Sequence, residues 1–482
     1  MRKIGVFICS YNGRKYVIDC IQSLKKQSMQ NFDVYVIDNA STDGTTAAIY
    51  EEFGDFVTVL QNSENLGGAG GFDRGLQHGI QAGYEFITLL DNDIILDEYA
   101  IENLYKHLIA HEDVGIVGAK VFFMDEPDKI MDFGSMINFQ EYKMIIGYTG
   151  EVDNPNIPET RECDYVPACA AMTRRSVLLE CGTMPVDCFI YVDDIEMCYR
   201  MKCKGYKVVV DAKARVWHKG GGSSRIANNT FGKYYNTRNE WNFFAKYMPE
   251  QQIEEFVDKI IHETFPVLYG CQHKGKKELY DTTWYIFHDF INNIRGKAQA
   301  GRINTLINRP NPALEIFKGK KYILIHLNCD DPCVLKQSDT KFMQLLGCIQ
   351  NINQDVEILL KIKSCLHDSD LMLLADAVYL KWNLKGMPEI FIAKKKDLEL
   401  VDLELQYCEH ATLVKQNVLP VVYWDNHFNF ITNNDDFNYY TNYDNALESF
   451  KQLHREKAIQ MIYSIREKNE KTLNGDNNKA VL

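Results

Sequence analysis

The sequence predicts an α/β protein in three parts: a domain built on a parallel sheet, a helical segment, and a smaller C-terminal α/β domain. Strands and helices alternate through about the first 220 residues, which is typical of parallel sheets. An aromatic-rich helical stretch follows, and alternation resumes after the proline-containing linker at residues 308–312. A chain of 482 residues is also too long for one core. We expect domains at residues 1–230, 231–312 and 313–482.

Apolar runs and helical spacing define the elements of the first domain. Val17, Cys20, Ile21 and Leu24, for example, recur at the period of a helix. Strands are expected at residues 4–10, 33–37, 57–61 and 86–90, and helices at 17–27, 45–53 and 72–82. Further short strands are expected at 116–123, 208–210 and 215–218. Right-handed crossovers then make the sheet parallel, and ligands bind at the carboxyl ends of such strands.

Two carboxylates stand where the fourth strand ends. Asp91 and Asp93 flank Asn92 directly after an apolar run. Hard cations such as Mg²⁺ and Mn²⁺ take carboxylate oxygens together with nucleotide phosphates. The triplet alone is a weak signal, but an earlier strand also ends in an acid, Asp38, and a second acidic pair, Asp193 and Asp194, follows later. The order indicates a metal-dependent enzyme that acts on a nucleotide-activated substrate.

The first two strand ends carry polar residues that suit a nucleotide. Ser10, Tyr11 and Asn12 follow the first strand, and Asp38 ends the second. Asp38 can accept a hydrogen bond from a base N–H or a ribose hydroxyl. Asp38 and its neighbour could equally shape a turn or cap a helix.

A glycine-rich stretch at residues 64–72 follows the third strand. Its glycines, Gly68 among them, let backbone N–H groups approach a diphosphate, and a helix N-terminus favours the anion. Asn65 lies in the same stretch; Arg74, one turn later, could contact phosphate or stay at the surface. A dinucleotide fingerprint would instead follow the first strand, so hydride transfer is not predicted.

Asp193 and Asp194 begin a helix that is expected to run to about residue 204. One of them could be a general base, although adjacent acids at a helix start also act as caps. His218 follows a Trp and precedes a run of glycines at a strand end. A neutral imidazole there would suit Mn²⁺ beside carboxylates.

Composition limits the partners and the location. The net charge of −13 argues against nucleic acid as the main partner, because phosphate binding needs a basic face. No apolar run approaches the roughly 18–20 residues that span a bilayer. The chain starts directly with a strand. We expect a cytoplasmic protein and leave peripheral association with the inner face of the membrane open.

Residues 1–240 resemble the family 2 glycosyltransferases, which have the GT-A fold. The resemblance rests on an ordered set of motifs at residues 10–12, 38–44, 64–72, 91–93, 193–200, 217–218 and 234–239. The glycine-rich segment is most similar to that of the galactofuranosyl- and rhamnosyltransferase branch. The membrane helices and the Gln-x-x-Arg-Trp motif of processive synthases are missing, so a polymer-extruding synthase is not expected.

The resemblance implies roles for particular residues. Asp93 is implied as the main metal ligand, with Asp91 near the ribose or the metal and His218 as a further ligand. Asp194 is implied as the base, and Asp193 stays an alternative. The donor sugar nucleotide is expected to contact Ser10, Tyr11, Asn12, Asp38, Asn65, Gly68, Arg74, Asp91 and Asn92.

The C-terminal domain is similar to the last part of a GT-B family 4 glycosyltransferase. The paired glutamates of that family are replaced by Gln406 and Leu413, so we expect a non-catalytic Rossmann-like accessory module. Because every implied donor-site residue precedes position 220, a chain that ends near Arg309 is expected to fold and bind donor.

The sequence thus predicts an inverting glycosyltransferase that uses Mn²⁺ or Mg²⁺. The donor would be a nucleoside diphosphate sugar, with UDP favoured and dTDP-rhamnose second. The acceptor would be a glycan or lipid-linked glycan of a cell-surface polysaccharide, and a homo-oligomer is left open. The alternatives are a sugar nucleotidyltransferase, which needs a Gly- and Arg/Lys-rich loop after the first strand, and a non-catalytic nucleotide-sugar-binding scaffold.

Overall fold

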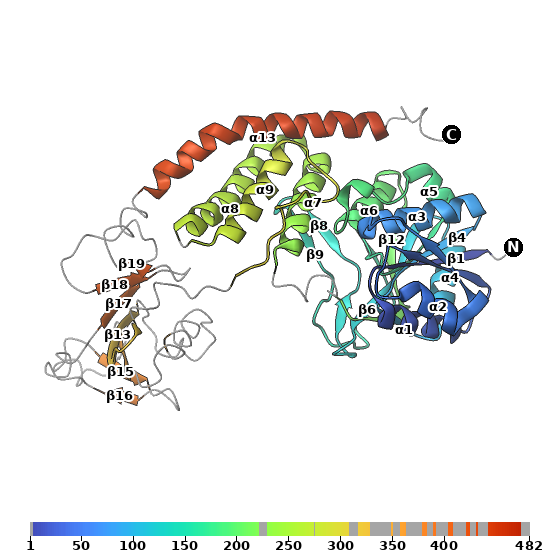
Figure 1. Ribbon diagram of the computed structural model, residues 1–482, viewed down its shortest axis with the longest axis horizontal. Helices are drawn as coiled ribbons and strands as arrows, with labels where there is room; N and C mark the ends of the chain where they lie inside the picture. The colour runs from blue at the N-terminus through green and yellow to red at the C-terminus, as the bar shows by residue number, and fades with distance from the viewer. Residues whose placement is uncertain are drawn as a thin grey trace. The chain divides into compact units, whose positions relative to one another are not determined.

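The chain folds into two compact units. The computed structural model describes residues 3–220, 229–273, 275–307, 317–327, 349, 357–362, 378–382, 389–391, 403–407, 421–424, 430–431 and 442–473. The first unit comprises Met1–Leu268, Lys277–Ile307 and Leu453–Leu482, and the second comprises Tyr269–Lys276 and Asn308–Gln452 (Figure 1).

A ten-stranded mixed sheet forms the centre of the first unit. Eight strands lie side by side in the order β10-β12-β6-β11-β4-β1-β2-β3, while β5 pairs with β12 and β7 with β6. The strands are β1 (Ile4–Ser10), β2 (Phe32–Asp38), β3 (Val57–Gln61), β4 (Phe86–Asp91), β5 (Ile94–Leu96), β6 (Val114–Phe123), β7 (Ile130–Asp132), β10 (Thr160–Cys163), β11 (Ala170–Arg174) and β12 (Lys207–His218). A separate hairpin joins β8 (Met136–Asn138) to β9 (Lys143–Ile145).

Helices connect these strands and then extend beyond them. They are α1 (Arg14–Lys25), α2 (Thr45–Phe53), α3 (Gly67–Ala82), α4 (Ala100–Ala110), α5 (Arg175–Cys181), α6 (Asp193–Cys203), α7 (Phe231–Tyr247), α8 (Ile253–His273), α9 (Lys277–Ile291) and α13 (Tyr443–Leu473). Short 3₁₀ turns lie at η1 (Gly54–Phe56), η2 (Val186–Cys188) and η3 (Glu250–Gln252). None of the helices in the described ranges combines the length and the apolarity that a membrane crossing needs.

The parallel strands expected from the sequence are present, with three differences. β1 pairs in parallel with β2 and β4, and β2 pairs in parallel with β3. The sequence did not indicate β11, which runs antiparallel between β4 and β6. Two short strands were expected within β12, which is continuous but has an irregular register between Asp211 and Arg215. The third difference is the start of α3, at Gly67 rather than residue 72.

Close packing explains why glycines continue into the helix α3. A Cβ atom on Gly71 would lie 2.4 Å from Cys9 Sγ of β1, and one on Gly67 would lie 2.0 Å from the Phe189 carbonyl oxygen. Such contacts force something to shift, so the absence of a side chain brings α3 against the sheet and the 189 segment. The glycine-rich stretch is thus largely a packing device.

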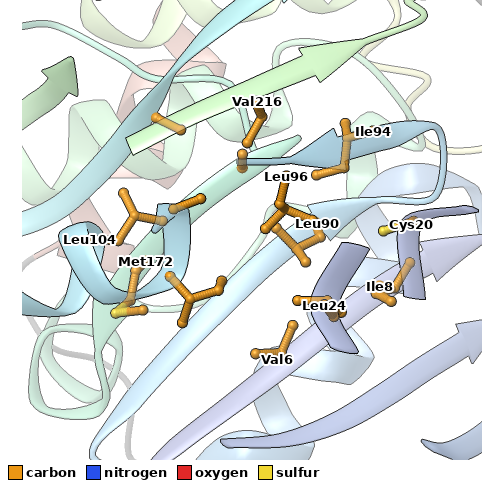
Figure 2. Close-up of a cluster of buried hydrophobic side chains, with 14 of the residues drawn as sticks. Val6, Ile8, Cys20, Leu24, Leu90, Ile94, Leu96, Leu104, Met172 and Val216 are labelled. Atoms are coloured by element: carbon orange, nitrogen blue, oxygen red, sulfur yellow. The ribbon is translucent and has the colours of Figure 1, made fainter. Parts of the chain in front are cut away.

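The main hydrophobic core lies between the sheet and the helices α1 and α4. Val6 and Ile8 of β1 meet Leu24 of α1, and Leu104 of α4 lies near Met172 of β11 (Figure 2). These side chains are at most 1% exposed. Burial of each large aliphatic side chain contributes about 1.5–3 kcal/mol, which fixes the strands and the register of their carboxyl ends.

The part of α13 from Leu453 onward belongs to the first unit, where it packs beside α8 and α9 (Figure 1). Ala458, Ile462 and Ile465 are at most 3% exposed and share one helical face. Arg455 bonds Asp258 at 2.9 Å, and Arg466 donates to the Met248 carbonyl at 2.6 Å. The C-terminal segment therefore completes the helical part of this unit.

The second unit holds a seven-stranded sheet in the order β16-β15-β14-β13-β17-β18-β19. Its strands are β13 (Tyr322–Leu327), β14 (Glu357–Ile362), β15 (Val378–Trp382), β16 (Glu389–Phe391), β17 (Leu403–Tyr407), β18 (Val421–Trp424) and β19 (Phe430–Ile431). β13 pairs in parallel with β14 and β17. Gln406 lies on β17, whereas Leu413 and the linker expected at 308–312 lie outside the described residues.

Candidate active site

Three adjacent parallel strands bring the predicted polar residues to one edge of the sheet. Ser10, the last residue of β1, pairs with Asp38, the last of β2. On the other side of β1, Cys9 pairs with Asp91, the last residue of β4. The register therefore places Ser10, Asp38 and Asp91 in a row.

Asp91, Asp93 and His218 form one cluster at this edge. One ligand atom from each residue lies within 4.8 Å of the others. His218 Nε2 is 3.0 Å from Asp93 Oδ1 and 3.6 Å from Asp91 Oδ2. β12 pairs with β5 so that His218 lies opposite Ile94, the residue after Asp93. This pairing brings His218 close to Asp93. Two carboxylates and one imidazole are a donor set that suits Mn²⁺.

The cluster holds more protons than free side chains would at neutral pH. Burial raises the pKa of Asp91 to about 7; His218 opposes that rise, while Asp93 and Asp194 add to it. Burial alone would lower the pKa of His218, but Cys169, Asp93 and Asp91 raise it well above its usual value. A divalent cation bound here would displace these protons. The Asp91 side chain is 34% exposed, so solvent reaches the cluster.

Asp193 and Asp194 occupy the first turn of α6, within electrostatic reach of Asp91. Burial raises the pKa of Asp193 well above its usual range, and the carboxylates of Asp194 and Asp91 add to this. Burial also raises the pKa of Asp194, but N–H groups of Ala168 and Ile195 donate to its oxygens at 3.1 and 2.8 Å and oppose the rise. The two adjacent acids thus have different surroundings.

Asp38 shapes its own loop. Its side chain is fully buried, Oδ1 accepts from the Ser41 N–H at 3.0 Å, and Oδ2 accepts from the Thr46 hydroxyl at 2.8 Å. These bonds match the turn-forming role that the sequence left open. Contact with a nucleotide base stays a prediction.

The segment after β1 links to the loops beside it. The Ser10 hydroxyl accepts from Asn92 Nδ2 at 3.1 Å, which ties β1 to the Asp91–Asp93 turn. Asn12 has a φ of 47° and accepts from the Thr42 N–H at 2.8 Å. Tyr11 is 49% exposed, so its ring is available to a ligand.

Asn65, Gly68 and Arg74 surround the start of α3. Asn65 Oδ1 accepts from the Gly67 N–H at 2.8 Å. A Cβ on Gly68 would meet its nearest neighbour at 3.7 Å, which is an ordinary contact. Arg74 Nη1 donates to the Gln61 carbonyl at 2.9 Å, so the guanidinium is engaged at the end of β3. Phosphate contacts of these residues stay predictions.

Three polar residues near the edge were not singled out from the sequence. Asn39 donates to the Gly67 carbonyl at 2.8 Å and accepts from Asn62 at 2.6 Å, which joins β2 to α3. Cys169 lies beside His218 and perturbs its pKa. Burial raises the pKa of Asp132, in β7, to about 7; bonds from Ser135 and Gly134 oppose the rise and Asp194 adds to it. Only pairing of distant strands brings Asp132 and Cys169 here, so no local pattern could reveal them.

Residues 5–180 match the family described as Glycosyl transferase family 2. Glycosyltransferase GlyG of Streptococcus pneumoniae is 34% identical over 26% of this chain and 41% of its own. The amylovoran biosynthesis glycosyltransferase AmsB of Erwinia amylovora is 24% identical over 43% of this chain and 67% of its own. A putative teichuronic acid biosynthesis glycosyltransferase, TuaG of Bacillus subtilis, is 30% identical over 22% of this chain and 40% of its own.

The chain spans about two fifths of the length of GlyG and of TuaG. A solved mannosyltransferase from Pyrobaculum calidifontis has a TM-score of 0.36 at 17% identity, covering 50% of this chain and 62% of that chain, a likeness too loose to support an argument. The family match includes β4 and the turn with Asp91 and Asp93, and it ends before β12, which carries His218. Residues 5–180 of this chain are therefore similar to a family 2 glycosyltransferase domain.

Proposed function

We propose that this chain is a metal-dependent, inverting glycosyltransferase that moves a sugar from a nucleoside diphosphate to a hydroxyl group of a glycan. The observation that carries the proposal is the joint position of two acidic groups. Asp91, Asp93 and His218 cluster at the carboxyl edge of the sheet. Burial raises the pKa of Asp91, and the charge of Asp194 adds to that rise, so the two acidic groups lie close together. A metal-ligand set and a general base are the two parts that such a transfer needs.

The metal would be held by Asp93 and His218, with Asp91 beside them. When bound, it supplies positive charge against the departing diphosphate. The chain's own residues bind the donor, and the backbone N–H of Ala168 fixes one oxygen of Asp194. Asp194 would receive the proton of the acceptor hydroxyl, because a base must be ionised. Burial raises the pKa of both acids, but N–H groups of Ala168 and Ile195 oppose the rise at Asp194, whereas Asp194 and Asp91 add to it at Asp193.

The substrates follow from the family and from the relatives. UDP is the favoured nucleotide and dTDP-rhamnose the second choice, as in the galactofuranosyl- and rhamnosyltransferase branch. The names of AmsB and TuaG refer to amylovoran and teichuronic acid, which supports a glycan or lipid-linked glycan acceptor in cell-surface polysaccharide synthesis. Such work would take place on the cytoplasmic side of a membrane. The accessory role expected of residues 313–482 belongs to the same proposal for residues 313–452, because the residues from Leu453 onward belong to the first unit.

A panel of UDP-, dTDP- and GDP-sugars with Mn²⁺ tests the proposal by release of free nucleoside diphosphate. We expect release with one donor class and its loss in EDTA, restored by Mn²⁺ or Mg²⁺. Undiminished turnover in EDTA would remove the metal from the proposal. Pyrophosphate release from a nucleoside triphosphate and a sugar phosphate would indicate a nucleotidyltransferase, and donor binding without turnover a scaffold.

His218→Ala provides the matched test of the ligand set. We expect the metal concentration for half-maximal rate to rise about 10–100-fold or more, the scale known for residues that support a metal site. His111→Ala is the control, because His111 is an exposed residue at the C-terminal end of α4 and is not part of the cluster. Equal metal dependence of the two variants would contradict the assignment of His218.

A further inference from the structure

The turn that precedes the acidic pair has an unusual backbone. Phe189, Tyr191 and Val192 have φ values of 67°, 64° and 67°. Positive φ is uncommon outside glycine, and for a β-branched residue such as Val192 it is an outlier. Such conformations persist only where the surroundings hold them. Asp193 and Asp194 follow immediately, so whatever holds this turn also places the candidate base.

Asn239, on α7, binds three carbonyl groups around this turn. Its Nδ2 lies 2.9 Å from the Cys188 oxygen, 2.8 Å from that of Ile190 and 3.0 Å from that of Tyr191. Because an amide nitrogen has two hydrogens, one of them is shared between two of these oxygens. The side chain is 1% exposed, so water cannot replace these bonds. One amide therefore ties the two sides of the turn together.

The orientation of this amide is fixed by Arg238. Nε and Nη2 of Arg238 both donate to Asn239 Oδ1 at 3.1 Å. Because a guanidinium only donates, the amide oxygen must face Arg238 and the nitrogen must face the carbonyls. Arg238 Nη2 also donates to the Cys188 oxygen at 3.2 Å, and the side chain is fully buried.

Buried groups support Arg238 in turn. Its Nη1 donates to the Tyr234 hydroxyl at 3.2 Å, and that hydroxyl donates to the carboxylate of Asp289. Arg302 Nε donates to Asp289 at 3.2 Å. Tyr234 and Asp289 are fully buried. A continuous network thus runs from α9 through α7 to the turn, which gives Tyr234, Arg238 and Asn239 of the motif at 234–239 a structural role.

The turn is also held from the side of α3. The Phe189 carbonyl accepts from the N–H of Ala69 in α3 at 3.1 Å. On the side of α7, the Phe189 ring stacks on Tyr235 with centroids 5.1 Å apart. Asn239 supplies the opposing contacts, so the turn is clamped between two helices.

We infer that Asn239, oriented by Arg238, is a positioning residue for the transfer reaction: it holds the 189–192 turn so that Asp193 and Asp194 meet the acceptor correctly. The inference rests on the proposed function. A misplacement of about 1 Å can cost on the order of 100-fold in rate, even from a residue that does not touch the substrate.

Asn239→Asp tests the inference with little change in volume. The carboxylate still accepts from Arg238 but cannot donate to the three carbonyls. Asn242→Asp is the matched control: Asn242 is fully buried on the same helix, and its Nδ2 donates at 2.8 Å to the Arg238 carbonyl rather than to the turn. We expect Asn239→Asp to lower kcat about 100-fold relative to Asn242→Asp, with the KM for the donor changed less than about threefold.

Amide hydrogen exchange gives a second readout that needs no activity. Exchange at residues 188–194 should accelerate at least about tenfold in Asn239→Asp and not in Asn242→Asp, while exchange in β1 and β4 stays unchanged in both. If Asn239→Asp does not fold, Asn239→Ala takes its place, since it removes the same donors without adding charge. We expect the same lower kcat and the same faster exchange at residues 188–194 in Asn239→Ala, relative to Asn242→Asp.

The two readouts separate the two proposals. Faster exchange in a protein whose wild type releases no nucleoside diphosphate would reject the proposed function and support the role of Asn239 in holding the turn. Active wild type, with equal kcat and equal exchange in the two Asp variants, would overturn the inference. Loss of kcat with unchanged exchange would also overturn it, because the turn would then not be what Asn239 controls.

Discussion

Replacing Ile462 by alanine should weaken the first unit, although the residue lies 20 positions from the end of the chain. The Ile462 side chain is fully buried within the first unit. Removal of buried methyl and methylene groups loses transfer free energy and leaves a cavity, so Ile→Ala at such a site costs about 2–5 kcal/mol. Domains have about 5–15 kcal/mol of net stability in all. One substitution in α13 should therefore remove a large fraction of the net stability of the first unit.

The assay is chemical denaturation of the full chain, with Leu453→Ala as the matched control. Leu453 lies on the same helix but is 74% exposed, and a surface change of this kind is expected to stay within about 0.5 kcal/mol. The free energy of unfolding of the first unit should fall by about 2–5 kcal/mol in Ile462→Ala alone. If the two variants unfold at the same denaturant concentration, α13 does not pack on the first unit.

The same contacts change an expectation drawn from the sequence. The sequence led us to expect that a chain ending near Arg309 folds on its own. Such a chain lacks the buried face of α13 and the bonds from Arg455 to Asp258 and from Arg466 to Met248. Loss of Ile462 and Ile465 alone would remove about 3–6 kcal/mol of burial. We expect that truncation to be far less stable than the full chain.

Two further predictions concern the acidic groups. Asp194→Asn should keep nucleotide binding and lose transfer by about 10²–10⁴-fold, with a smaller loss in Asp193→Asn; reversed effects would exchange the two roles, and near-full activity in both would place the base elsewhere. The second concerns Asp132, whose pKa burial raises to about 7 in the folded state, with bonds from Ser135 and Gly134 opposing the rise. Since an unfolded Asp titrates near 3.9, the folded state holds the extra proton between about pH 4 and pH 7, and stability falls as the pH rises through that window. Asp132→Asn should remove this component, so the melting temperature of the variant minus that of the wild type should increase from pH 4.5 to pH 7.5. If the two melting temperatures change in parallel with pH, Asp132 is not buried as described.

Local sequence patterns alone predict the parallel strands of the core and most of the polar edge. Local periodicity and turn residues identify strands that end at Ser10, Asp38 and Asp91, and a parallel sheet brings such ends together without further information. The ordered motifs added the family, and the family match at residues 5–180 agrees. Those signals are carried by residues close together in the chain, which is why they could be read from it.

The contacts between residues that are far apart in the sequence could be seen only in the tertiary structure. Pairing of β12 with β5 brings His218 to Asp93, 125 positions away, and the antiparallel β11 lies inside a sheet that was expected to be parallel. Neither the bonds from Asn239 to the 188–191 carbonyls nor the face of α13 on the first unit leaves a periodic signal. Each depends on the free energy of contacts between distant segments, and that free energy exists only once the chain has folded.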